Sequence, residues 1–106
     1  MIMLNRDREE ANRVWSLLDY DDHEIEYVIN RDEGGLFSTV TRYNWVKDKG
    51  SEVEWRFYDR TTDEIVEQMI EDGVVGVSEG EMYVFKSEVE ECMNEWCSSY
   101  VEYGRL

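Results

Sequence analysis

The sequence predicts a single α+β domain over residues 1–106, with helices packed on an antiparallel sheet and the element order α-β-β-β-α-β-β-α. Three observations support this prediction. The length is that of one domain. The hydrophobic fraction of 42% is enough for a core. Apolar residues recur at helical spacing near both ends and once in the middle, and they alternate as in strands between these segments.

The first helix is expected from about Asn5 to Leu18. Apolar side chains recur there every three or four residues, which places them on one side of a helix, as Ala11, Val14, Trp15 and Leu18 do. Asn5 can cap its N-terminus. The segment therefore has the pattern of an amphipathic helix, followed by a polar connector at residues 19–24.

An antiparallel meander of three strands is expected next. Its strands are predicted at residues 24–30, 36–46 and 52–59. Gly34 and Gly35 fit a turn between the first two strands, and residues 47–51 fit a hairpin loop. In the third strand Val53, Trp55 and Phe57 should face the core. For the strand at 36–46 the sequence leaves open which face is buried.

Two capping boxes and a hairpin are expected in the second half. Thr61-Thr62-Asp63-Glu64 has the Thr-x-x-Glu spacing that starts a helix, and Gly73 is placed to end that helix. A short hairpin should follow, with strands at 74–77 and 82–85. Ser87-Glu88-Val89-Glu90 is a second capping box, which predicts a third helix from Ser87 to about Tyr103.

The known catalytic and cofactor motifs are absent from the sequence. The glycines form neither a GxGxxG nor a P-loop pattern, so nucleotide binding has no support. Cys92 and Cys97 are the only cysteines, and with one histidine they cannot complete a zinc site. Both thiols are expected to be reduced and partly buried. We therefore expect no cofactor and no enzymatic activity.

The net charge of −15 restricts the class of partner. Residues 1–60 carry 14 acidic and 9 basic residues, which gives −5, whereas residues 61–106 carry 12 and 2, which gives −10. Such a chain repels nucleic acid and anionic membranes and attracts basic protein surfaces. The sequence has no membrane-spanning apolar run and no signal-peptide pattern, so a cytoplasmic location is expected.

Carboxylates are expected on the outer faces of the second and third helices and in the turn between them. Like charges at this spacing destabilise a helix slightly, which favours a function for them over a role in folding. Two exposed aromatic residues could anchor the rim of the interface. The residues predicted to contact a basic partner are Asp63, Glu64, Glu67, Glu71, Asp72, Glu79, Glu81, Glu88, Glu91, Glu95, Tyr43 and Trp45.

In its small size, strong acidity and lack of catalytic motifs, the chain resembles the phage-encoded inhibitors that mimic DNA, including anti-restriction and anti-CRISPR proteins. The resemblance rests on no motif, and no site residues follow from it. It implies an inhibitor that occupies the basic nucleic-acid site of a nuclease or CRISPR effector. We expect the chain to be a monomer or a homodimer. The host cytoplasm would be its place of action.

Four alternatives remain open at this stage. The acidity can serve solubility alone. An immunity protein that neutralises a cognate toxin nuclease would also be small and acidic. A metal-dependent hydrolase could use the cluster of Asp19, Asp21, Asp22 and His23, whose oxygens suit a hard cation. A structural adaptor subunit could pair its meander with another chain.

Overall fold

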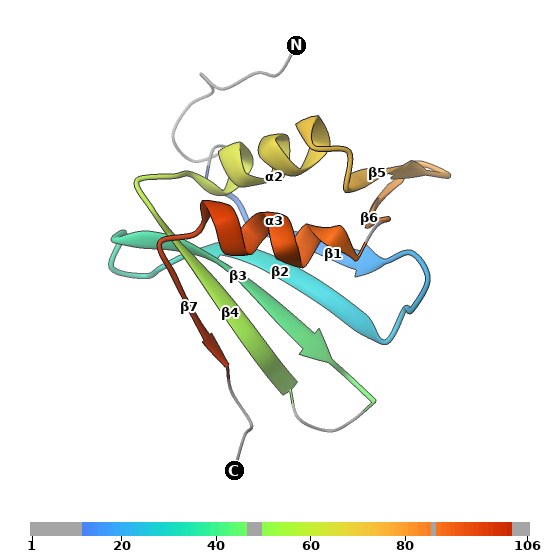
Figure 1. Cartoon of the computed structure of the whole chain (residues 1–106), viewed down its shortest axis with the longest axis horizontal. Coiled ribbons are helices and arrows are strands. Elements are labelled where there is room, and N and C mark those ends of the chain that lie inside the picture. Colours follow the sequence, from blue (N-terminus) through green and yellow to red (C-terminus); the bar gives the residue numbers. More distant parts are fainter. Residues whose placement is uncertain (1–11, 47–49, 86, 103–106) are drawn as a thin grey trace.

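The computed structural model describes residues 12–46, 50–85 and 87–102 (Figure 1). Within these residues the chain forms seven strands and two helices. Their bounds are β1 (Trp15–Asp19), β2 (Ile25–Arg31), β3 (Phe37–Asn44), β4 (Gly50–Tyr58), α2 (Thr62–Glu71), β5 (Val75–Ser78), β6 (Glu81–Val84), α3 (Glu88–Trp96) and β7 (Ser99–Glu102). None of the described helices is long and apolar enough to span a membrane.

The strands form one sheet in the order β5-β6-β1-β2-β3-β4-β7. The meander of β2, β3 and β4 is antiparallel, as predicted. However, β1 pairs in parallel with β6, so the sheet is mixed and the expected antiparallel sheet is wrong. The parallel pair arises because the chain leaves the meander through α2 and returns through the β5–β6 hairpin beside β1.

The first predicted helix is wrong where the structure describes it, because Trp15–Asp19 form strand β1. Residues 12–14 are not helical either, and residues 5–11 of that prediction lie outside the described residues. β1 pairs with β2 on one side and with β6 on the other, and Leu17 is fully buried. These hydrogen bonds to two neighbouring strands decide the conformation, and residues distant in sequence supply them.

The third predicted helix is too long, since α3 ends at Trp96. Cys97 is extended, with φ −74° and ψ 157°, and the Ser98 backbone N–H donates to the Arg56 carbonyl at 2.7 Å. The chain then pairs with β4 as strand β7. Serine is a weak helix former, so Ser98 and Ser99 allow the helix to stop where this pairing begins.

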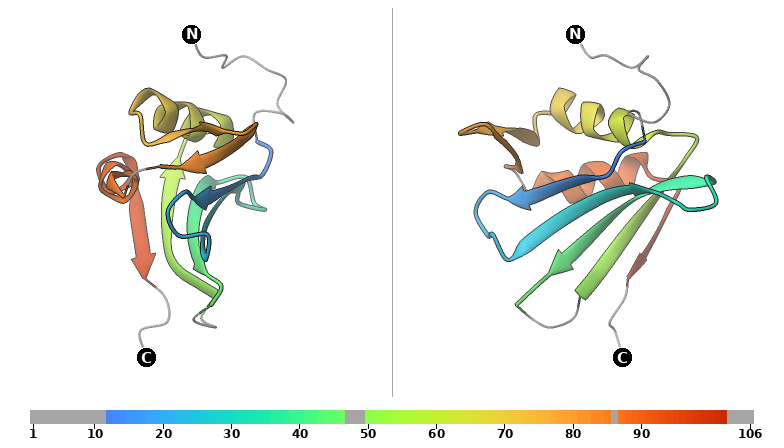
Figure 2. Two further views of the ribbon diagram at one scale, coloured as in Figure 1. Left: turned by 90° about the vertical axis from the view of Figure 1, so that its right-hand side faces the viewer. Right: turned by 180° about the vertical axis from the view of Figure 1, so that it is seen from behind.

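The expected packing of three helices on the sheet is also wrong. The described residues form a structure that is mainly sheet, with two short helices that adjoin different strands. α2 lies near β5 and β2, whereas α3 lies near β4. Figure 1 shows α2 across the upper end of the sheet and α3 in front of the sheet, and the left view of Figure 2 shows α3 end-on beside the sheet. The helices therefore do not form a common covering layer.

The capping box of α2 is confirmed, and that of α3 is wrong. The Thr61 side chain accepts a hydrogen bond from the Glu64 N–H at 3.1 Å, and Glu64 Oε1 accepts one from the Thr61 N–H at 2.8 Å. Gly73 ends this helix with φ +75°, as predicted. Ser87 makes no side-chain cap hydrogen bond, because its own backbone is already helical with φ −63° and ψ −20°.

The core fills the space between the sheet and the two helices. Val53, Trp55 and Phe57 are buried as predicted, and on β3 the buried face is that of Ser38 and Val40. The helices contribute five buried apolar side chains, from Ile65, Val66, Met69, Val89 and Met93. Cys92 and Cys97 are free and half-buried, as predicted.

We predict that Thr61→Ala lowers the free energy of unfolding by about 1 kcal/mol, because alanine has no side-chain oxygen to accept the hydrogen bond from the Glu64 N–H. Ser87→Ala is the matched control and should change it by less than about 0.5 kcal/mol. Urea unfolding followed by circular dichroism measures both values. Equal losses in the two variants would contradict the assignment of the caps.

Candidate functional site

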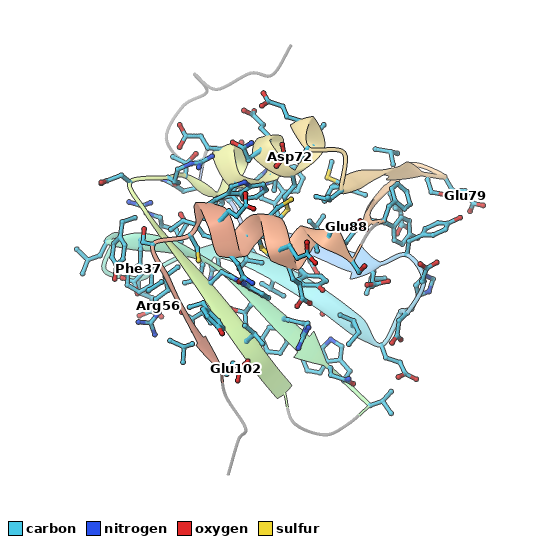
Figure 3. The ribbon with its side chains drawn as sticks, in the orientation of Figure 1. Phe37, Arg56, Asp72, Glu79, Glu88 and Glu102 are labelled. Atoms are coloured by element: carbon cyan, nitrogen blue, oxygen red, sulfur yellow. The ribbon has the colours of Figure 1, made fainter. Side chains whose placement is uncertain are left out.

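Seven of the ten predicted acidic residues are exposed to solvent. They are Glu71, Asp72, Glu79, Glu81, Glu88, Glu91 and Glu95. Figure 3 labels three of them and shows Asp72 and Glu88 over the two helices, with Glu79 far from both at the tip of the β5–β6 hairpin. The carboxylates of the hairpin and of the helices thus lie in two separate places.

Asp63 and Glu67 do not lie on the outer face of α2, in contrast to the prediction, since only 3% and 9% of their surfaces are exposed. Trp15 Nε1 donates to Asp63 Oδ1 at 2.7 Å, and Arg13 Nε lies 3.5 Å from the same oxygen. The segment around β1, for which a helix was predicted, thus covers this side of α2. Glu64 is half-buried and is engaged in the capping box.

The thiol of Cys92 on α3 is influenced by carboxylates of both helices. Burial raises the pKa of this thiol, and three neighbouring carboxylates raise it further. Asp72 comes from the C-terminal end of α2, whereas Glu91 and Glu95 come from α3. Since Glu88 shares the stripe of Glu91 and Glu95 on α3, we define Asp72, Glu88, Glu91 and Glu95 as the acidic face.

Apart from Lys86, which precedes Glu88 by two positions and lies outside the described residues, no basic residue is near the acidic face in sequence. Residues 61–85 and 87–102, all of which the structure describes, contain neither Lys nor Arg. The described arginines lie earlier in the chain, on or next to β1, β2, β3 and β4. The charge of the acidic face is therefore not balanced by its own helices.

The carboxylates of the β5–β6 hairpin accompany a group of aromatic rings. Glu79 and Gly80 form the turn, with φ of 53° and 84°. Burial raises the pKa of Tyr83, and so do the carboxylates of Glu81 and Glu79. Tyr20 packs edge-on against Tyr83, with ring centroids 5.6 Å apart. This second acidic region thus belongs to the β5–β6 end of the sheet.

Tyr43 and Trp45 stack on each other, with ring centroids 4.9 Å apart and planes within 1°. Trp45 is 56% exposed, and its Nε1 donates to Glu26 Oε1 at 2.8 Å. Arg42 of the same strand points toward α3, where it pairs with Glu90. Because side chains alternate along a strand, Tyr43 lies on the opposite face of the sheet, away from the acidic face.

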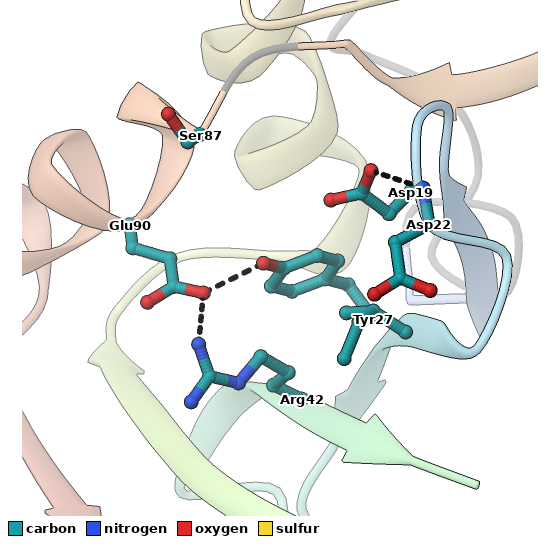
Figure 4. A pocket seen from close by; sticks show the side chains of 7 residues that line it. Asp19, Asp22, Tyr27, Arg42, Ser87 and Glu90 are labelled. Carbon is teal, nitrogen blue, oxygen red and sulfur yellow. Dashed lines mark hydrogen bonds and ion pairs between the residues drawn. The ribbon is translucent and has the colours of Figure 1, made fainter. Parts of the chain in front are cut away.

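Sequence reasoning missed a cluster that joins α3 to the sheet. The Tyr27 hydroxyl donates to Glu90 Oε2 at 2.7 Å, and the Arg42 guanidinium forms an ion pair with the same oxygen (Figure 4). A signal was present, because on a helical wheel Glu90 falls about 100° or more from the stripe of Glu88 and Glu91. That position flanks the core side of α3, where Val89 and Met93 are buried.

This cluster forms one side of a cavity of about 330 Å³. The cavity is lined by Asp19, Asp22, Ile25, Tyr27, Arg42, Ser87 and Glu90. Asp19 and Asp22 come from the connection between β1 and β2, and Ser87 and Glu90 come from the start of α3. Residues far apart in sequence thus meet in one hollow of the surface.

The cluster of Asp19, Asp21, Asp22 and His23 is organised as a turn. Asp19 Oδ1 accepts hydrogen bonds from the backbone N–H groups of Asp21 at 2.8 Å and Asp22 at 3.0 Å. His23 stacks on Tyr83 with centroids 5.9 Å apart. In the described part of the chain no three acidic, His or Cys side chains are placed to hold a metal ion. The metal-dependent hydrolase thus receives no support from this geometry.

The sequence matches no protein-family model, and no curated protein or solved structure is significantly similar to it. Its function therefore has to follow from the chemistry of its own side chains.

We predict that Tyr27→Phe lowers the free energy of unfolding at pH 7 by about 1 kcal/mol through the lost hydrogen bond to Glu90. Burial and Glu90 raise the pKa of Tyr27 in the folded protein above its ordinary value of 10.0. The neutral phenol therefore stabilises the fold fully below pH 10. Above it, ionisation in the unfolded chain removes about 1.4 kcal/mol per pH unit.

The difference in unfolding free energy between wild type and Tyr27→Phe should accordingly shrink as the pH rises from about 10 to about 11. Urea unfolding at each pH measures it. Tyr100→Phe, whose ring is 52% exposed, is the control for the loss of one hydroxyl at pH 7. A difference that stays constant from pH 9 to pH 11 would contradict the protected state of the Tyr27 hydroxyl.

Proposed function

We propose that this chain is a non-enzymatic inhibitor that binds the basic nucleic-acid site of a nuclease or CRISPR effector as a DNA mimic, in the cytoplasm. The acidic face of Asp72, Glu88, Glu91 and Glu95 is the contact surface. The observation that carries the proposal is that these four carboxylates are exposed on α2 and α3, whose described residues contain no Lys or Arg. Charges from two helices then present one anionic surface, as two phosphate strands do.

The spacing of the carboxylates suits this role. Glu88, Glu91 and Glu95 follow each other at about 4.5 and 6 Å along the axis of α3. On duplex DNA, phosphates follow each other about every 3.4 Å of axis along one strand. Lys and Arg side chains that bind phosphates can reach carboxylates at such intervals, because both groups accept charge-assisted hydrogen bonds.

Two of these carboxylates lie at the C-terminal ends of helices, where they lower the stability of the helix. Asp72 is the C-cap of α2, and Glu95 lies in the last turn of α3. Neither last turn contains a basic residue. The C-terminal end of a helix carries partial negative charge, so a carboxylate there costs about 0.3–1 kcal/mol. Asp72 Oδ1 accepts a hydrogen bond from Gln68 Nε2 at 3.4 Å, but the helix dipole favours neither position, whereas a cationic partner would favour both.

The proposed contact surface contains fewer residues than the set predicted from the sequence. Asp63 and Glu67 are buried, Glu64 caps α2, and Tyr43 and Trp45 lie on the other face of the sheet. Glu79 and Glu81 lie apart on the hairpin. We therefore place the partner over the acidic face, with Glu71 at its margin.

The test is a triple variant, Asp72→Asn with Glu91→Gln and Glu95→Gln. The matched control removes the same charge from exposed positions elsewhere, with Asp21→Asn, Glu33→Gln and Asp59→Asn. We predict that the triple variant binds its partner at least about tenfold more weakly, while its unfolding free energy stays the same or rises. The control variant should bind as wild type does.

The partner is first captured from bacterial lysates on the immobilised protein and identified by mass spectrometry. The decisive measurement then uses the purified partner, with calorimetry for affinity and cleavage of duplex DNA for inhibition. A mimic competes with duplex DNA, and its affinity falls steeply between about 0.05 and about 0.5 M salt. Simultaneous binding of DNA and this protein, or wild-type inhibition by the triple variant, would refute the proposal.

A further inference from the structure

The cavity between the β1–β2 connection and the start of α3 has a defined set of walls. Tyr27 and Ile25 contribute an aromatic ring and an aliphatic side chain from β2. Asp19 and Asp22 stand on one side, and Glu90 stands opposite them next to Arg42 (Figure 4). Its volume of about 330 Å³ lies at the lower end of the range for small-ligand sites.

The charges on these walls do not balance. Glu90 is matched by the guanidinium of Arg42 and by the hydroxyl of Tyr27. Asp19 and Asp22 each use Oδ1 to accept backbone N–H groups of their own turn. Neither has a cationic partner among the described residues. The carboxylates of Asp19 and Asp22 thus give the hollow an excess of two negative charges.

The chemistry of the walls favours an organic cation over other ligands. An anion would face three carboxylates against one arginine that is already paired. A metal ion would need a set of three ligands, which the described residues do not bring together. An ammonium or guanidinium group instead gains from the carboxylates on one side, and its carbon atoms can pack against the wall that Ile25 and the largely buried Tyr27 form on the other.

We propose that this cavity binds one organic monocation, an alkylammonium or guanidinium group, at the carboxylates of Asp19 and Asp22. Its stem would lie against Ile25 and Tyr27. The group can belong to a free amine or to a Lys or Arg side chain of another protein. The residues differ from those of the acidic face, so this inference does not rest on the proposed function and either can fail alone.

The test is an NMR titration of the isotope-labelled protein with n-butylammonium chloride. We expect saturable shifts of the amide signals of Asp19, Asp22, Tyr27 and Ser87. Asp22→Asn should weaken binding about fivefold, because it removes one charge but keeps the side-chain oxygen that accepts the Glu24 N–H. Asp21→Asn is the matched control, since Asp21 is exposed in the same turn and does not line the cavity.

Two further ligands test whether binding needs the positive charge and whether the bound cation is a free amine or a protein side chain. Butan-1-ol is the uncharged counterpart of the amine and should cause no saturable shift at these amides. Tighter binding of capped Gly-Arg-Gly than of n-butylammonium would indicate a protein side chain, and the reverse would indicate a free amine. The proposal is overturned if butan-1-ol binds equally well, if Asp21→Asn weakens binding as much as Asp22→Asn, or if n-butylammonium causes no saturable shift.

Discussion

The contact of Glu90 with Tyr27 and Arg42 fixes the position of α3, and much of the structure depends on it. It holds the start of the helix against β2 and β3, while Trp55 Nε1 donates to Asn94 Oδ1 at 2.7 Å farther along. With α3 held in this rotation, Val89 and Met93 enter the core. The stripe of Glu88 and Glu91 is then turned to solvent, and Glu90 closes one wall of the cavity.

The parts of the fold that the sequence could predict are those with local signals. Alternation predicted β2, β3 and β4 because each strand has one buried face, as with Val53 and Trp55. The Thr61 capping box and Gly73 marked the ends of α2 because caps involve residues only a few positions apart. The β5–β6 hairpin was found through the turn residues around Gly80, which adopts φ +84°.

The wrong predictions have a common cause. In each case a segment distant in sequence determines the conformation or the burial of the residue. β1 is a strand because β2 and β6 pair with it, and β7 is a strand because β4 does. Asp63 is buried because Trp15, 48 positions away, donates a hydrogen bond to it. The cavity likewise combines Asp19 and Glu90, which line opposite sides of it. No periodicity within one segment contains this information, so charge pattern alone could not separate outward carboxylates from inward ones.

The positions of the acidic residues bear on whether the net charge of −15 serves solubility alone. Solubility depends on the total charge and hardly on where each carboxylate stands. Carboxylates at a helix N-terminus, such as Glu88, stabilise the helix, whereas Asp72 and Glu95 stand at C-terminal ends and oppose the dipole. The same solubility was available at exposed positions without this cost, and a cationic partner over the acidic face would offset it.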